Sequence, residues 1–147
     1  MKWVTRREMR VNRTATAWLV RRFIDPSATF VFVAPEEVAA LQGREPAVGF
    51  DAPGARYPHA DSQGRCSFEA LVAEHRPDDE VLRELARIVR GADFSDEIAL
   101  TPESAGLRAI SQGFPLVARD DHETLERAAF LYDSLYAALE QRRLASR

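Results

Sequence analysis

The feature that most constrains the fold is an apolar segment over residues 13 to 24 that ends abruptly at Asp25-Pro26. Proline disfavours helical backbone in the residue before it, so a helix here must end at Asp25. The apolar residues recur at helical spacing and fall near one face: Ala15, Trp18, Leu19 and Phe23. The next segment, residues 29 to 33, is β-branched and aromatic and therefore predicts a strand.

Start and stop signals divide the rest of the chain into further elements. A basic amino-terminal arm precedes the first helix. The pattern then predicts a short helix from Pro35 to Leu41 closed by Gly43, a strand over 47 to 50, and four helices over 67 to 75, 78 to 90, 101 to 112 and 121 to 142. Asp78 is predicted to cap the second of these four helices and Gly91 to end it.

Length and composition favour one domain. The 147 residues are 46% hydrophobic, enough for a single core and too few to promise two. We find no internal repeat or low-complexity linker. The sequence therefore predicts one domain over residues 1–147 of the α+β class, helix-rich, with one small β-sheet and a long C-terminal helix.

The charge balance argues against nucleic acid and membranes as partners. Twenty basic and twenty-three acidic side chains give a formal charge of −3, so autonomous nucleic-acid binding has no global electrostatic support. No stretch approaches the roughly 20 apolar residues of a membrane-spanning helix, and the start lacks a secretory core. We therefore expect a cytoplasmic protein. Cys66 is the only cysteine, which excludes an internal disulfide, and we assign it no redox role.

Two histidines, each followed by a glutamate on a helix, are candidate metal ligands. His122 and Glu126 are four residues apart and so project from one helical face, while His59 lies in a loop shortly before Glu69. If the four converge, two imidazoles and two carboxylates suit Zn, Mn or Fe better than Ca. The competing interpretation is ordinary structure: His59 makes a loop hydrogen bond, Glu69 complements a helix dipole, and Glu126 pairs with an arginine.

Arginines at the first helix are the other candidates for binding. Guanidinium matches a tetrahedral oxyanion through paired hydrogen bonds. Arg13 is at the predicted helix start, where free backbone N–H groups favour anions. Arg22 falls on the apolar side, so either its stem covers the core or its head reaches a carboxylate such as Asp51 or Asp93. A structural ion pair is the alternative for both arginines.

The order of several motifs resembles the carboxy-terminal domain family of ChrB-type chromate resistance proteins. These motifs are residues 12 to 26, Phe50-Asp51, His59, residues 66 to 69, residues 90 to 93 and residues 120 to 122. The resemblance extends from about Lys2 to about Tyr136. It implies an association with chromate resistance and its regulation, and it places His59, Glu69, Asp93 and the pair Asp121-His122 in the most distinctive motifs. Asp51, Asp93 and Asp121 are expected to support the site.

The opening motif departs from the pattern of that family. The family leads us to expect aspartate before Arg13 and a cysteine and proline before Trp18, whereas this chain has Asn12 and Thr16-Ala17. If those groups bind metal or chromate in relatives, this member binds more weakly, differently or not at all. Regulators of the family carry an additional amino-terminal segment, so direct transcriptional control by this chain is doubtful.

Three functional classes follow from these patterns. The first is a chromate-response module that binds a metal ion or small oxyanion in a pocket between the first helix, the His59 loop and the last helix. The second is a small metal-dependent enzyme that uses the His/carboxylate set. The third is a structural protein that forms a homodimer through its Leu/Tyr-rich terminal helix. No nucleophile triad or phosphate-binding glycine loop is present in the sequence.

Overall fold

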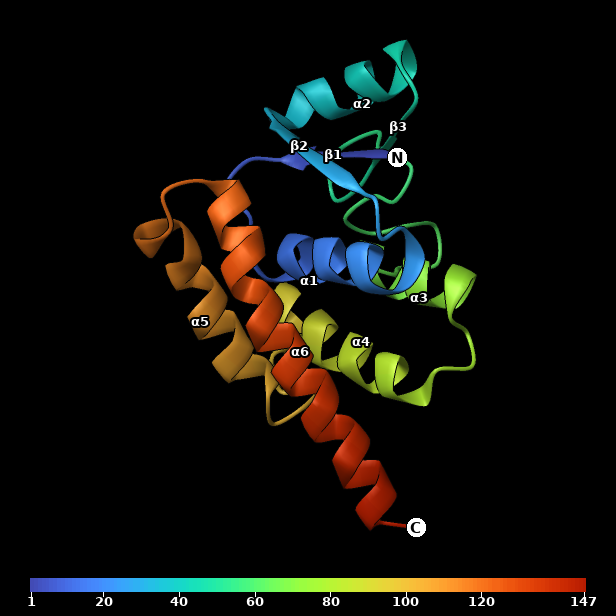
Figure 1. The fold of residues 1–147 in the computed structure, drawn as a ribbon, viewed down its shortest axis with the longest axis vertical. Helices are drawn as coiled ribbons and strands as arrows, with labels where there is room; N and C mark the ends of the chain where they lie inside the picture. The colour runs from blue at the N-terminus through green and yellow to red at the C-terminus, as the bar shows by residue number, and fades with distance from the viewer.

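The computed structural model describes residues 1–147 and shows a helix-rich α+β domain built on one small parallel sheet. Its strands are β1 (Lys2–Arg6), β2 (Thr29–Val33) and β3 (Ala47–Gly49). The spatial order is β2-β1-β3, with Trp3 opposite both Phe30 and Val48 (Figure 1). The first strand of the chain is therefore the centre of the sheet.

The prediction of a basic amino-terminal arm is wrong, because this segment is the central strand. Lys2 and Arg6 lie at its two ends, while Trp3, Val4 and Thr5 between them are buried. Trp3 packs in the main hydrophobic core and Val4 in a smaller cluster on the other face. The basic residues at its two ends made this segment look like an exposed arm, although it is a short strand with both faces buried.

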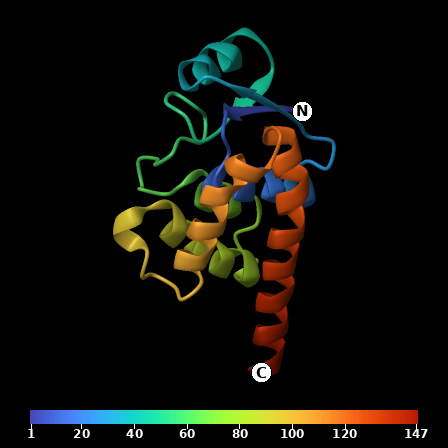
Figure 2. The same cartoon turned by 90° about the vertical axis from the view of Figure 1, so that its left-hand side faces the viewer.

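The sheet lies between two helices. The first helix, α1 (Val11–Leu19), continues into a π-helical turn, η1 (Val20–Ile24), which ends before Pro26 as predicted. The second, α2 (Pro35–Arg44), carries proline in its first turn and includes Gly43, so the predicted stop at Gly43 is wrong. In Figures 1 and 2, α1 and α2 lie on opposite faces of the sheet. The chain thus crosses from β1 to β2 on one face and from β2 to β3 on the other.

The remaining helices pack beneath α1. They are α3 (Ser67–His75), α4 (Glu80–Asp93), the single turn η2 (Ser95–Glu97), α5 (Ser104–Val117) and α6 (Asp121–Ala145). Two predicted boundaries of α4 are wrong: Asp79 is the cap and accepts from Leu82 N at 2.9 Å, and Gly91 lies within the helix. The predicted start of α5 at Thr101 is three residues early.

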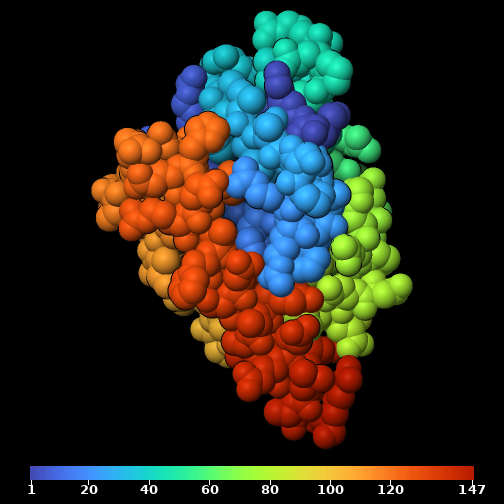
Figure 3. Space-filling model, viewed as in Figure 1, coloured from blue at the N-terminus to red at the C-terminus, as the bar shows by residue number.

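The core lies where α6 crosses α1. Trp18 and Leu19 are buried as predicted, and Tyr132 of α6 is fully buried against them. The Tyr132 hydroxyl lies 2.8 Å from Thr14 Oγ1 and donates to Val11 O at 3.1 Å. The carboxy-terminal end of α6 projects beyond the body of the molecule (Figure 3). No helix of the protein has the length and apolar character needed to cross a membrane.

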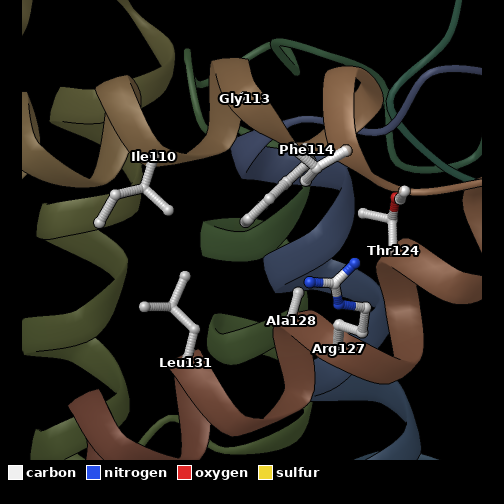
Figure 4. Close-up of a pocket in the computed structure, with 9 residues that line it drawn as sticks. Ile110, Gly113, Phe114, Thr124, Arg127, Ala128 and Leu131 are labelled. Atoms are coloured by element: carbon white, nitrogen blue, oxygen red, sulfur yellow. The ribbon is translucent and has the colours of Figure 1, made fainter.

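An apolar hollow separates α5 from α6. Figure 4 shows Ile110 and Phe114 of α5 facing Leu131 of α6, with Arg127 at the rim. The hollow has a volume of about 340 Å³ and no acidic residue in its lining. It lies away from the polar edge of the sheet, where most of the conspicuous motifs meet.

Gly91 is needed where α4 approaches the loop before α5. A Cβ placed there would lie 2.3 Å from Ser104 Oγ and 3.0 Å from the Glu97 carbonyl oxygen. We predict that Gly91→Ala lowers the free energy of unfolding by about 1–3 kcal/mol, the usual cost of overpacking. Denaturant unfolding measures this change.

Gly106 provides the matched control for Gly91→Ala. It is an exposed glycine in α5, and a Cβ there would meet nothing within 4 Å. Gly106→Ala should raise the free energy of unfolding by about 0.5–1 kcal/mol, because alanine favours helix. Equal effects of the two substitutions would contradict the close approach at Gly91.

Candidate functional site

A cavity lined mainly by charged residues lies at the carboxyl edge of the sheet. Arg6 ends β1, Ala34 follows β2, and Asp51 comes shortly after β3. In open sheets with helices on both faces, ligands bind outside the carboxyl ends of the strands, where successive crossovers diverge to opposite faces. A cavity of about 620 Å³ opens there, lined by Arg6, Arg7, Glu8, Arg10, Arg13, Ala34, Pro35 and Asp93.

A buried carboxylate organises the wall of this cavity. Asp51 is 1% exposed, and its two oxygens receive Arg13 Nη1 at 3.2 Å, Arg6 Nη2 at 3.3 Å and His59 Nδ1 at 3.0 Å. Burial alone would raise the pKa of Asp51, but the His59 hydrogen bond and the two guanidinium charges outweigh it and lower the pKa. Asp51 is therefore ionised and fixes three cationic or titratable side chains.

Two non-glycine residues with left-handed backbone flank the site. Asp51 has φ 49° and Glu8 has φ 62°, a conformation that is uncommon for residues other than glycine. The turn at Asp51 is held by Arg6 Nε, which donates to the Asp51 carbonyl oxygen at 2.6 Å. The turn at Glu8 is held by Asp121, whose carboxylate accepts from Glu8 N at 3.0 Å and Met9 N at 2.8 Å. Backbone strain of this kind is often found at functional sites.

Asp121 brings the start of α6 to the cavity. Its two hydrogen bonds fasten the loop between β1 and α1, and the Glu8 carbonyl oxygen in that loop accepts from Arg13 Nη2 at 2.8 Å. The supporting role expected for Asp121 thus corresponds to positioning the loop that carries the arginines. In Figure 1 the start of α6 lies beside the carboxyl end of β1.

Asp93, the last residue of α4, supplies a second carboxylate to the same wall. Its Oδ2 lies 3.5 Å from His59 Nδ1, which is closer to Asp51, and this buried oxygen has no hydrogen-bond partner. Burial, followed by the Asp51 charge, raises the pKa of Asp93 to about 6. The hydrogen bond to Asp51 raises the pKa of His59. The cavity lining therefore includes a carboxyl group, Asp93, whose pKa is shifted toward neutral pH, next to a histidine whose positively charged form is favoured.

Arg13 reaches the cavity from the first turn of α1. Its side chain is 12% exposed, and its Nε is buried without a hydrogen-bond partner. Burial lowers the pKa of Arg13, although the Asp51 charge opposes the change, and an arginine remains charged regardless. The helix start has no side-chain cap and no acidic residue in its first turn, which leaves its positive dipole end unneutralised. The anion-binding prediction for Arg13 is compatible with this placement.

The four predicted metal ligands do not form a common site. His59 contacts Asp51, Glu69 pairs with Arg90 at 2.8 Å, Glu126 pairs with Arg21 at 3.1 Å, and the His122 ring packs edge-on against Phe32. No group of three or more His, Cys, Asp or Glu side chains in the chain is arranged to hold a metal ion. The prediction that these four side chains approach one another is wrong, because each is engaged by a different partner.

Arg22 is paired, as predicted, but with a partner that was not expected. It donates to Asp133 Oδ1 at 2.9 Å, and Trp18 Nε1 donates to the same oxygen at 2.8 Å. The guanidinium also lies over the rings of Trp18 and Tyr136. The expectation that Arg22 reaches Asp51 or Asp93 is wrong, because it faces α6 and is 42% exposed there. Arg22 does not line the arginine cavity.

The two residues that depart from the family pattern meet at one serine in the core. Asn12 and Thr16 are buried, and both contact Ser67 Oγ, at 2.8 Å and 3.1 Å. These neutral side chains therefore join α1 to α3 without a buried charge. Cys66, the residue before Ser67, is fully buried, and burial raises the pKa of its thiol well above the usual value. A reactive thiolate is disfavoured there.

Sequence reasoning missed four charged residues of the cavity: Arg6, Arg7, Glu8 and Arg10. They fell in the segment that was interpreted as a basic arm. The available signal was the cluster of arginines after Trp3-Val4-Thr5, which points to the cavity only once that segment is recognised as a strand.

The raised pKa of Asp93 predicts a pH-dependent cost to stability. The ordinary pKa is 3.8 and the folded value is about 6, so between these values the folded state binds more protons than the unfolded state and stability falls as pH rises. Asp93→Asn removes this cost. At pH 8 it should raise the free energy of unfolding by roughly 1–3 kcal/mol, and near pH 4 it should have little effect.

Chemical denaturation of both proteins at the two pH values tests this expectation. Equal stability of Asp93→Asn and wild type at pH 8 would mean that burial and the Asp51 charge do not destabilise the ionised Asp93 carboxylate.

Comparison with known proteins agrees with the resemblance in sequence. The family model described as "ChrB, C-terminal domain" matches residues 3–139. Protein ChrB of Cupriavidus metallidurans is 37% identical over 138 residues, which cover 92% of this chain and 40% of that protein. The chain thus spans less than half the length of this relative. No solved structure matches it significantly. From the match over nearly its whole length, this chain belongs to the ChrB C-terminal domain family.

Proposed function

We propose that this protein is a binding module of the chromate response, and that it binds a tetrahedral oxyanion in the arginine-lined cavity at the carboxyl edge of the sheet. The observation that carries the proposal is the set of four arginines, Arg6, Arg7, Arg10 and Arg13, around one hollow of about 620 Å³. The link to chromate comes from the family resemblance, which implies an association with chromate resistance.

The charges of this cavity favour a small anion. Arg6 and Arg13 are held in place by Asp51, whereas Arg7 and Arg10 are exposed and form no ion pair with the protein. The first pair is therefore preorganised, and the second pair is free to close on a ligand. Charge-assisted hydrogen bonds from guanidinium are among the stronger polar contacts in proteins, and preorganised donors lower the entropy cost of binding.

The alternatives have less support from the geometry. The hypothesis of a metal-dependent enzyme requires four ligands to converge, but these side chains contact different partners. The terminal helix α6 buries its Leu/Tyr-rich face against α1 and α4 within the same chain, which weakens the argument for a homodimer through that face. Oxyanion binding uses side chains that are already brought together.

Chromate binding to the wild-type protein is the first test. Titration calorimetry at fixed ionic strength and about pH 6.5 should detect binding, because the raised pKa of His59 favours its positively charged form beside Asp51. Arg13→Ala should weaken binding at least about tenfold, corresponding to roughly 1.4 kcal/mol. Arg10→Ala, which breaks no ion pair of the protein, should weaken it about threefold to tenfold.

Arg127→Ala is the charge-matched control for these variants. Arg127 is an exposed arginine of α6 whose only ion pair is with Glu123 on the same helix, so its removal should leave chromate affinity unchanged. Absence of chromate binding to wild type, or equal losses in Arg10→Ala and Arg127→Ala, would overturn the proposed site.

A further inference from the structure

Asp93 is an unusual component of an anion-binding wall. It carries a negative charge into a cavity lined by four arginines, yet none of them pairs with it. Its only close charged neighbour is His59, at 3.5 Å. An acid that served only to balance the arginines would be expected to contact one of them.

The partners of Asp93 are already committed elsewhere. His59 Nδ1 lies closer to Asp51, at 3.0 Å, and a single ring N–H makes one good hydrogen bond. Arg6 and Arg13 also turn to Asp51. Neither oxygen of Asp93 therefore accepts a hydrogen bond from the protein: Oδ2 is buried without a partner, and the side chain, 15% exposed, lines the cavity.

The other groups around Asp93 do not supply a donor either. Four charged or titratable groups shift the pKa of Asp93, and the charge of Asp93 shifts the pKa of two more. The first four are Asp51, His59, Arg6 and Arg13, and the other two are Cys66 and Tyr132. Cys66 is buried at the start of α3, and the Tyr132 hydroxyl donates to Val11 O. A donor for Asp93 must therefore come from water or from a bound ligand.

We propose that Asp93 is the specificity-determining residue of the cavity, and that it selects tetrahedral oxyanions that carry a proton, such as hydrogen phosphate and hydrogen chromate, over sulfate. The inference rests on the proposed function of the cavity. An ionised carboxylate only accepts hydrogen bonds. It therefore accepts from the hydroxyl of a hydrogen-bearing oxyanion, while it repels sulfate, which has no proton to offer at neutral pH.

The difference in affinity between the two kinds of oxyanion should be large. The contact with Asp93 is an attractive hydrogen bond for an anion that carries a proton and a repulsive contact for sulfate. A site built to receive a ligand hydroxyl rejects the analogue that lacks it, since the buried acceptor is left unpaired. The doubly charged hydrogen phosphate ion, HPO4²⁻, and sulfate carry the same charge and have similar size. Their difference in affinity therefore reports the contact with Asp93 rather than the total charge of the cavity.

The test compares inorganic phosphate with inorganic sulfate on the full chain. Titration calorimetry at about pH 7.5, where Asp93 is ionised, should give at least about tenfold tighter binding of phosphate to wild type. In Asp93→Asn the side-chain amide can donate to sulfate, so the two affinities should come within about threefold of each other.

Glu8→Gln is the matched control for this comparison. Glu8 is the other acid in the cavity lining, and it is exposed, so its substitution removes the same charge. Glu8→Gln should change both affinities alike and keep the wild-type preference for phosphate. Circular dichroism verifies that each variant is folded.

Each outcome bears on a separate claim. Equal binding of phosphate and sulfate to wild type, or an unchanged preference in Asp93→Asn, would overturn the role of Asp93 and leave oxyanion binding in place. Loss of the preference in Glu8→Gln as well would assign selectivity to total charge and also overturn it. If wild type binds phosphate, sulfate and chromate undetectably, the proposed function fails, and this inference with it.

Discussion

The buried carboxylate of Asp51 is the interaction on which the polar edge of this domain depends. It joins β1 through Arg6, α1 through Arg13 and the loop after β3 through His59. An unpaired charge in that position would cost several kcal/mol, and pairing removes most of that cost. The same contacts that stabilise the buried Asp51 charge also hold Arg6 and Arg13 in the lining of one cavity, with His59 bound to the same carboxylate.

The position of that cavity follows from the connections of the sheet. Because β1 is central and the two crossovers lie on opposite faces, the loops after the neighbouring strands β1 and β2 diverge at the carboxyl edge and leave a crevice. The start of α6 closes one side, where Asp121 accepts two backbone N–H groups of the loop after β1. Elements from both ends of the sequence thus converge on the arginines, with the last residue of α4, Asp93, between them.

The sequence predicted all six α-helices and two of the three strands, and the errors in their boundaries and in the missing strand have physical reasons. The helix end before Pro26 and the start of the last helix at Asp121 depend on local backbone chemistry, and both are observed. Gly91 was mistaken for a helix end, since its close approach to Ser104 is a tertiary contact that local patterns cannot show. The central strand Lys2–Arg6 was not predicted because its ends are charged and its residues do not alternate between apolar and polar. It is a strand because it pairs with β2 on one side and β3 on the other.

The candidate site was partly predictable. Arg13, Asp51, His59, Asp93 and Asp121 were named from sequence, and the structure brings all five to the edge of the sheet. The helical spacing of His122 and Glu126 was correct, but spacing on one helix does not show what faces it, and arginines or aromatic rings occupy those positions.

The most direct test of oxyanion binding at this edge is the map of backbone amide chemical shifts during a titration with chromate. Binding in the arginine cavity predicts that the changes concentrate at residues 6 to 13, at Ala34 and around Asp93, which line it or adjoin its lining. Amides of the α5–α6 hollow and of the carboxy-terminal half of α6 should stay unchanged. Shifts confined to those distant helices, or no shifts at saturating chromate, would contradict a binding site at the carboxyl edge of the sheet.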